Sequence, residues 1–164
     1  MPTLALLNGH AFAGGFMLGM YHDYRIQNAD RGFLCLNELE FGVPLQAPMV
    51  SVFREKLAPT VFRDLVLEAK RFGGAEALKT GVVDGLGGLD EALAFTKQRG
   101  LTKKAESGVY AALREEMYRE SVGIVNDHQG NLRWRETVEE ITGAEREDAK
   151  KAVEAWEKRQ GSKL

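Results

Sequence analysis

The sequence predicts an α/β domain that continues into helices at its C-terminus. Near the N-terminus, an apolar strand-like run, a glycine-rich turn, a helical stretch and a second strand-like run follow one another within the first 27 residues, which is typical of a strand–helix–strand unit. Beyond residue 100 the composition changes to charged amphipathic helix. We therefore divide the chain into an α/β part, residues 1–100, and a helical part, residues 101–164.

Three short apolar segments are predicted to form strands of one sheet. They are Thr3–Leu7, Asp23–Gln27 and Gly32–Leu36. Small residues after the first of them predict that a helix opens at Gly14 or Gly15 and continues through "FMLGMYH". The residues "NAD" form a turn between the second and third strands, and residues 82–86 could form one more short strand.

Helices dominate the sequence from residue 47 onward. Pro59 suits the first turn of a helix, and Gly81 ends another. The expected helices cover residues 47–57, 59–69, 74–81 and 89–98. A helical apolar stripe follows at residues 107–125, interrupted by "NDHQGN", and the capping-box pattern of Thr142 and Glu145 predicts the start of the last helix.

The composition indicates a single soluble globular domain and excludes several classes of partner. The chain has 164 residues, of which 44% are hydrophobic and 28% charged. Its 22 basic and 24 acidic residues give a net charge of -2, so we expect no nucleic-acid partner. The apolar runs are shorter than the roughly 18 residues of a membrane span, and the single cysteine, Cys35, cannot form an internal disulfide.

Small residues stand where the first strand feeds the first helix. Ala13, Gly14 and Gly15 occupy this place, where the unpaired N–H groups of a helix start can hold an anion or a developing oxyanion. Close packing of helix on strand would require the same glycines, so the residues alone leave both interpretations open. The sequence contains no phosphate-binding loop, no metal-ligand cluster and no Ser, His, Asp set.

Two glutamates, Glu38 and Glu40, lie among apolar residues in "FLCLNELEFGVP". A strand face or turn could expose both of them to water. Alternatively, one of them lies in an apolar pocket, surrounded by Leu36, Leu39 and Phe41, and carries a proton. The spacing does not decide between these interpretations.

Two longer stretches together resemble a known family. "PTLALLNGHAFAGGFMLGMYHDYRI" and "RGFLCLNELEFGV" are similar to the crotonase (enoyl-CoA hydratase/isomerase) superfamily, and within it to the peroxisomal 3,2-enoyl-CoA isomerases of fungi and plants. The similarity runs from Pro2 to about Asp84 and more loosely to the end. It implies a crotonase-like fold, with part of the ββα spiral core in residues 1–100 and helices after it.

The resemblance also implies roles for individual residues. The family's second oxyanion donor corresponds to the backbone N–H of Gly14, and the proton-shuttling glutamate of "LNE" corresponds to Glu38. The implied substrate is an acyl-CoA, which brings coenzyme A with it, so neither a separate cofactor nor a metal is expected. Ala13, Gly15, Met17 and Leu36 are expected to contact the substrate.

Met17 distinguishes two reactions within the family. Hydratases carry a second glutamate at the matching position, and a thioether cannot activate water. Isomerisation of 3-enoyl-CoA to 2-trans-enoyl-CoA in fatty-acid β-oxidation, which needs one base, is therefore expected, and a hydratase is the weaker alternative.

Family members also carry a segment before the "PT" strand, which supplies the first oxyanion donor and much of the coenzyme A contact. The chain begins at Met1 without it, so the resemblance leaves one oxyanion donor of two. A catalytically silent crotonase-fold fragment or partner subunit is the alternative function. The family's trimers imply a homo-oligomer.

The last three residues, Ser162, Lys163 and Leu164, spell the peroxisomal address that an import receptor reads at a free C-terminus. The sequence therefore predicts a peroxisomal protein with that receptor as a partner.

Overall fold

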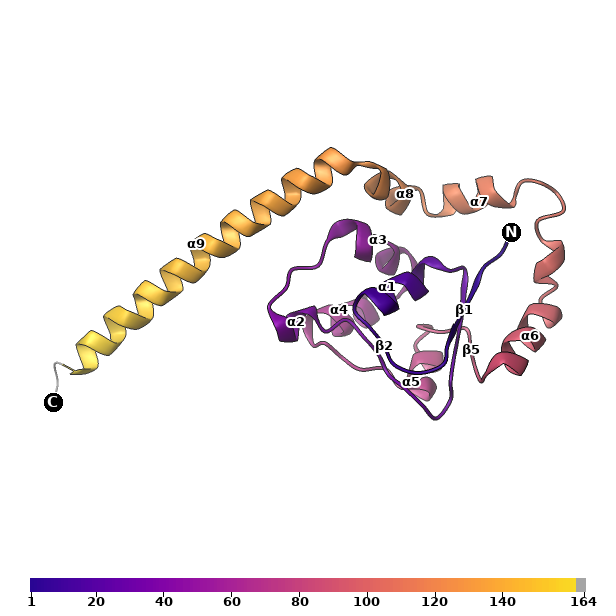
Figure 1. Cartoon of the computed structure of the whole chain (residues 1–164), viewed down its shortest axis with the longest axis horizontal. Coiled ribbons are helices and arrows are strands. Elements are labelled where there is room, and N and C mark those ends of the chain that lie inside the picture. The colour runs from indigo at the N-terminus through magenta and orange to yellow at the C-terminus, as the bar shows by residue number, and fades with distance from the viewer. Residues whose placement is uncertain (162–164) are drawn as a thin grey trace. The chain divides into compact units, whose positions relative to one another are not determined.

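The structure, a computed structural model, describes residues 1–161, and the chain divides into two compact units (Figure 1). The first unit covers Met1–Asn126, and the second begins at Asp127. The predicted peroxisomal address at Ser162–Leu164 lies outside the described residues. Helices α7 and α8 belong to the first unit, whereas the boundary at residue 100 stays a prediction.

A three-stranded parallel sheet forms one layer of the first unit. Its order is β1 (Leu4–Leu7), β3 (Tyr24–Gln27) and β5 (Gly85–Leu86), which confirms two of the predicted strands and the short strand near residues 82–86. Ile26 pairs with Gly85. A Cβ added to Gly85 would lie 2.7 Å from the Ile26 Cδ1 atom. A side chain at residue 85 would therefore displace the end of the buried Ile26 side chain where β5 meets β3.

The third predicted strand lies in a different sheet, so its placement beside the other two was wrong. Strand β4 (Leu34–Cys35) pairs in parallel with β2 (Ala11–Phe12) in a separate two-stranded sheet. On its other side, Leu34 exchanges both backbone hydrogen bonds with Phe72. Because β4 has a partner on each side, it has no free edge to add to the first sheet.

Helix α1 (Gly14–Tyr21) begins at Gly14, as predicted. It buries Phe16, Met17 and Met20 in the core. Gly19 allows it to approach β1 closely, because a Cβ at this position would lie 3.3 Å from the Leu7 Cδ2 atom.

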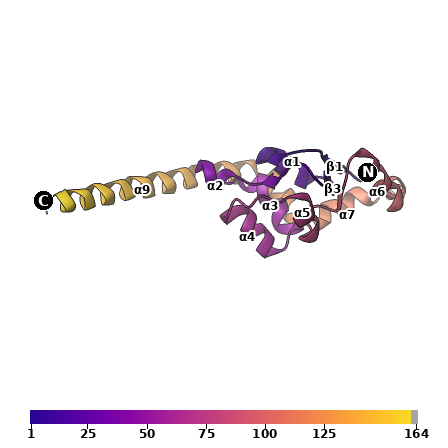
Figure 2. The same ribbon diagram turned by 90° about the horizontal axis from the view of Figure 1, so that it is seen from below.

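Four helices of the α/β part agree with the predicted segments: α3 (Ala47–Lys56), α4 (Pro59–Leu67), α5 (Gly74–Lys79) and α6 (Leu89–Gln98). Two short helices were not predicted, α2 (Glu38–Phe41) and the 3₁₀ helix η1 (Leu101–Lys103). Pro59 is the first residue of α4, where its missing N–H costs no hydrogen bond. Helix α3 lies between α1 and α4 (Figure 2), and Phe53 of α3 packs edge to face on Phe16 at 5.1 Å between ring centroids.

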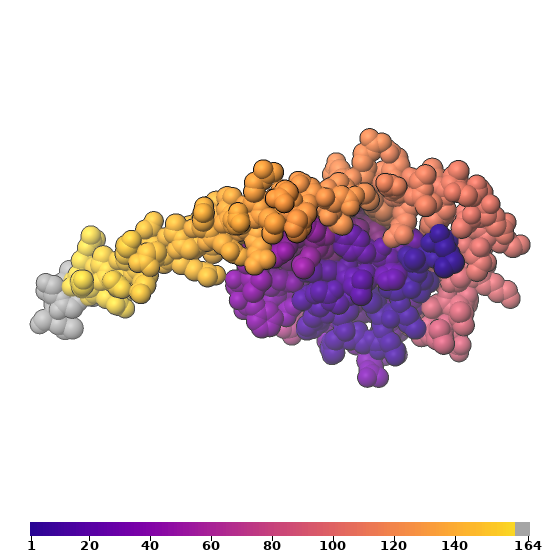
Figure 3. Space-filling model, turned by 45° about the horizontal axis from the view of Figure 1, so that its top comes forward, coloured from indigo at the N-terminus to yellow at the C-terminus, as the bar shows by residue number. Residues whose placement is uncertain are grey.

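The predicted helix at residues 107–125 is two helices, α7 (Tyr110–Met117) and α8 (Arg119–Asn126). They separate at Tyr118, whose φ of -114° and ψ of 36° are not helical. Helix α8 packs on α3, where the buried Ser121 hydroxyl donates to the Glu55 carboxylate. In the space-filling view the surface of the chain's first third is indigo to purple (Figure 3).

Within the described residues, the second unit contains one long helix, α9 (His128–Gly161). The predicted helix start at Thr142 was wrong, because Thr142 lies within α9 and its hydroxyl donates to the Val138 carbonyl at 2.6 Å. The same threonine-to-glutamate spacing occurs inside helices, where the hydroxyl bonds the preceding turn. Across residues 1–161, no helix is both long and apolar enough to cross a membrane.

Candidate active site

The carboxyl ends of β2 and β4 meet at one edge of the small parallel sheet. Strand β2 continues through Ala13 into α1, and β4 continues through Leu36 and Asn37 into α2. The Ala13 N–H donates to the Cys35 carbonyl at 3.0 Å at this edge. The two predicted functional positions, Gly14 and Glu38, therefore follow neighbouring strand ends, as polar groups of parallel-sheet sites commonly do.

The start of α1 presents free backbone donors. Gly14 is the first residue of the helix, and the first intrahelical bond runs from the Met17 N–H to the Ala13 carbonyl at 2.9 Å. The N–H of Gly14 has no acceptor among residues 1–161. Such donors, together with the helix dipole, stabilise negative charge at this position.

Backbone strain accompanies these donors. Ala13 has φ 48° and ψ -125°, a conformation that residues with a Cβ rarely adopt. Strain of this kind costs of order 1–3 kcal/mol and is concentrated at functional sites. It fixes the direction in which the chain leaves β2 and so aims the start of α1.

Open space surrounds both glycines that follow Ala13. A Cβ built on Gly14 or Gly15 meets no described atom within 4 Å, in contrast to Gly19 on the same helix. Tight packing within residues 1–161 therefore does not require glycine at the helix start. The space leaves a ligand free to approach the backbone.

Glu38 is the first residue of α2, and one of its oxygens is buried. The Oε2 atom has no hydrogen-bond partner among the described residues. The side chain lines a cavity of about 210 Å³ whose other walls are apolar: Leu36, Leu39, Val43, Leu45, Val66 and Leu67. A buried carboxylate oxygen without a partner costs free energy, which is common where a polar group serves a ligand.

Glu40 has a different environment. Its side chain is 44% exposed and pairs with Arg71 at 3.3 Å. Glu40 is thus exposed and paired, whereas Glu38 is partly buried. The two carboxylates are not equivalent, a difference that their spacing in the sequence could not predict.

The other residues predicted near the site, Leu36, Leu39, Phe41 and Met17, differ in whether they line the Glu38 cavity. Leu36, 1% exposed, lines the Glu38 cavity together with Leu39, whereas Phe41 is 72% exposed and is not one of its walls. Met17, 5% exposed, packs in the core. A substrate contact at Met17 stays a prediction.

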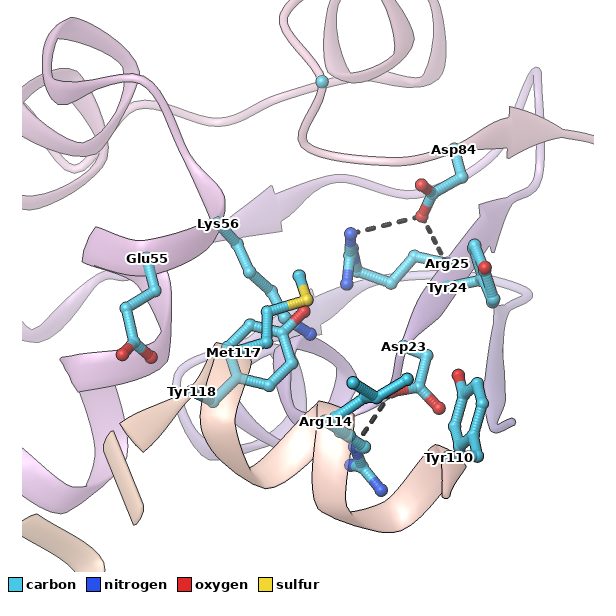
Figure 4. A pocket seen from close by; sticks show the side chains of 12 residues that line it. Asp23, Tyr24, Arg25, Glu55, Lys56, Asp84, Tyr110, Arg114, Met117 and Tyr118 are labelled. Carbon is cyan, nitrogen blue, oxygen red and sulfur yellow. Dashed lines mark hydrogen bonds and ion pairs between the residues drawn. The ribbon is translucent and has the colours of Figure 1, made fainter. Parts of the chain in front are cut away.

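Sequence reasoning missed a larger cavity, of about 510 Å³, beside the residues that follow α1 (Figure 4). Its charged walls are Asp23, Arg25, Glu55, Lys56, Asp84 and Arg114. These side chains come from segments far apart in the sequence, so no local pattern indicates them.

The described residues include no group of three or more His, Cys, Asp or Glu side chains that could hold a metal ion. Cys35 is buried, its thiol donates to the Ala69 carbonyl at 3.1 Å, and burial raises the pKa of the thiol. A raised thiol pKa disfavours the reactive thiolate.

Comparisons with known sequences match the chain to one family. The sequence profile of the enoyl-CoA hydratase/isomerase family matches residues 1–162. Enoyl-CoA delta isomerase 3 of Arabidopsis thaliana is 34% identical over 138 residues, which cover 80% of the chain and 58% of that protein. The peroxisomal enoyl-CoA delta isomerase 2 of the same plant is 34% identical, with coverages of 76% and 55%. The chain therefore spans about half the length of the curated relatives it matches.

Solved structures show the same fold. A probable enoyl-CoA hydratase from Mycobacterium tuberculosis H37Rv superposes with a TM-score of 0.66 over 82% of the chain and 57% of that protein, at 20% identity. An enoyl-CoA hydratase/isomerase family protein from Pseudomonas syringae gives a TM-score of 0.60 over 75% and 56%, at 25% identity. These matches confirm the predicted crotonase-like α/β fold, and the chain belongs to the enoyl-CoA hydratase/isomerase family, the crotonase superfamily.

Proposed function

We propose that the chain isomerises 3-enoyl-CoA to 2-trans-enoyl-CoA in fatty-acid β-oxidation, with Glu38 as the proton shuttle and the Gly14 N–H as an oxyanion donor. The observation that carries the proposal is the unpartnered Oε2 atom of Glu38 in an apolar cavity. The relatives named as enoyl-CoA delta isomerases support the same reaction class.

The proposed mechanism needs one base and a stabilised oxygen. Glu38 removes a proton from C2 of the thioester, and the electron pair moves toward the carbonyl oxygen, which the Gly14 N–H stabilises as an enolate. The protonated glutamate returns the proton at C4, and the double bond moves from C3–C4 to C2–C3. Atoms and charge balance without a further reactant.

Substrate contacts follow from the same edge of the sheet. Ala13 and Gly15 flank the oxyanion donor, and Leu36 lines the cavity beside Glu38. Coenzyme A enters as part of the acyl-CoA substrate, so the proposal requires no separate cofactor. Met17 is apolar where a hydratase needs a second carboxylate, which makes hydration of the double bond the weaker alternative.

A second candidate function is that of a catalytically silent partner subunit. It is favoured by apolar side chains that the C-terminal helices expose, such as Leu113 of α7 (64% exposed) and Trp156 of α9 (61% exposed), which suit contact with another subunit.

The test compares two matched carboxylate variants. Glu38→Gln keeps the side-chain shape and removes the base, so the rate of isomerisation of a trans-3-enoyl-CoA should fall by about 100-fold or more, whereas Glu40→Gln should change it little. The absorbance of the conjugated thioester reports the reaction. The reverse result would exchange the roles of the two glutamates. The silent partner would be favoured if the protein binds acyl-CoA but neither isomerises it nor exchanges its C2 protons with deuterated water.

Localisation and assembly are parts of the same proposal. Peroxisomal residence is supported by Ser162–Leu164 in the sequence and by two relatives that are named peroxisomal. We expect the import receptor to bind this tripeptide and the chain to assemble as a homotrimer, which light scattering of the purified protein would test.

A further inference from the structure

Three cationic side chains converge on the C-terminal end of α1. They are Arg25 of β3, Lys56 of α3 and Arg114 of α7, which we call the cation cluster. Figure 4 shows Lys56 extending from its helix toward Tyr118 and Arg25. All three belong to the first compact unit.

The cation cluster binds three consecutive backbone carbonyls, those of residues 20–22. The Lys56 Nζ atom donates to the Met20 carbonyl at 2.5 Å and to the His22 carbonyl at 2.6 Å. The Arg114 guanidinium donates to the Tyr21 carbonyl at 2.9 Å, and that of Arg25 to the His22 carbonyl at 3.1 Å. Since the last carbonyls of a helix lack intrahelical partners, the cluster caps α1 with positive charge.

Lys56 differs from the two arginines in its charge balance. Arg25 pairs with Asp84 at 3.1 Å and Arg114 with Asp23 at 2.9 Å, whereas no carboxylate lies within ion-pair distance of Lys56 among residues 1–161. Burial, and then repulsion by Arg25, lower the pKa of Lys56 to about 8. Lys56 is therefore the member of the cluster whose charge changes near neutral pH.

The opposite end of α1 carries the proposed oxyanion donors. With 8 residues, the helix is about 12 Å long, so the ammonium group lies roughly one screening length from the Gly14 N–H. Positive charge interacts favourably with the C-terminal end of a helix, so protonated Lys56 holds this end of α1 in place.

We propose that Lys56, held among Arg25 and Arg114, is a positioning residue that fixes α1 from its C-terminal end and so aims the Gly14 N–H at the substrate oxygen. This inference rests on the proposed function for its consequence in catalysis, but not for its structural content. Protonated Lys56 holds the helix start in the productive direction, and loss of the proton weakens that hold.

Other titratable and charged groups face Lys56 from the surrounding elements. They are His22 and Asp23 after α1, Arg25 of β3, Glu55 of α3, Asp84 before β5, Tyr110 and Arg114 of α7, and Tyr118 between α7 and α8. Burial raises the pKa of Tyr110 to about 12 and also raises that of Tyr118, so neither phenol titrates near pH 8. Replacement of Lys56 identifies its own contribution among these groups.

The experiment follows the Gly14 and Gly15 amide resonances with pH in four proteins: the unchanged chain, Lys56→Arg, Lys56→Met, and Lys97→Met as an exposed control on α6. We expect both amides of the unchanged chain and of the control to titrate with a midpoint near pH 8. Lys56→Arg should keep the low-pH positions throughout, because arginine stays charged, and Lys56→Met should keep the high-pH positions.

An isomerase assay adds the catalytic consequence. Lys56→Met should lower kcat by about 10-fold with little change in KM, and Lys56→Arg should restore it and keep it constant between pH 7 and 9. A titration of the glycine amides that persists in Lys56→Met, or that is absent from the unchanged chain, would overturn the inference. If the amides behave as expected but no variant isomerises 3-enoyl-CoA, the positioning role stands and the proposed function fails.

Discussion

The substitution Gly14→Ala tests whether glycine at this position is needed for packing or for the approach of a ligand. An added Cβ meets no described atom within 4 Å, so the substitution introduces no clash. Alanine is favoured over glycine in helices by about 1 kcal/mol, and part of this gain applies at a first helical position. We therefore expect the free energy of unfolding to rise by about 0.5 kcal/mol. The methyl group would occupy the space beside the Gly14 N–H, and isomerase activity should fall by about 10-fold or more.

Urea denaturation and the isomerase assay measure the two effects on the same preparation. Gly19→Ala is the matched control: its Cβ would lie 3.3 Å from the Leu7 Cδ2 atom, so the cost of this contact opposes the helical gain of about 1 kcal/mol that alanine brings. If Gly14→Ala lowered the free energy of unfolding by 1 kcal/mol or more, Gly14 would be a packing residue. Unchanged activity would show that no substrate atom approaches it.

Three further predictions follow from local features. Ala13→Gly should raise the free energy of unfolding by about 1 kcal/mol in urea denaturation, because glycine relieves the strain at φ 48°, and a loss of stability would contradict that strain. For Lys56, the folded pKa of about 8 lies below the ordinary 10.5, so burying its charge destabilises the fold below pH 8, and this cost disappears between pH 8 and 10.5. Discounted for partial exposure, stability should rise by about 1–2 kcal/mol across this window, and Lys56→Met should abolish the rise. Deletion of Ser162–Leu164 should leave a fluorescently tagged chain in the cytosol, and unchanged peroxisomal import would refute the address.

Local signals account for the parts of the fold that the sequence predicts well. Helix α6 occupies residues 89–98 as expected, since the Gly88 N–H bonds the Glu91 carboxylate at its start. Strand β4 was assigned to the wrong sheet because two residues carry no information on which neighbour they pair with. The partner of β4 on its far side is Phe72, 38 residues away from Leu34, and such pairing depends on tertiary structure.

The same distinction applies to the site. Glu38 follows a strand that the sequence predicts, whereas β2, the strand before Gly14, lies in the stretch that was predicted to be a turn. The family resemblance indicated both residues, and neither environment could be predicted. The cation cluster joins residues 25, 56 and 114, and no spacing rule connects them. The partly buried lysine at the end of helix α3 has the same local pattern as a lysine that reaches water.

Several residues in or next to α1 and α2 lower the stability of the fold. Ala13 is strained, the Oε2 atom of Glu38 is buried without a partner, and Lys56 is held where its charged form is disfavoured. A fold selected for stability alone would remove each of them by one substitution, and glycine, glutamine and methionine are obvious replacements. Raising the pH through 8 should stabilise the protein while weakening the oxyanion donors. If Lys56 is a positioning residue, the free energy of unfolding should rise with pH while the isomerase activity falls. If Lys56 only supported the fold, the two quantities would change in the same direction.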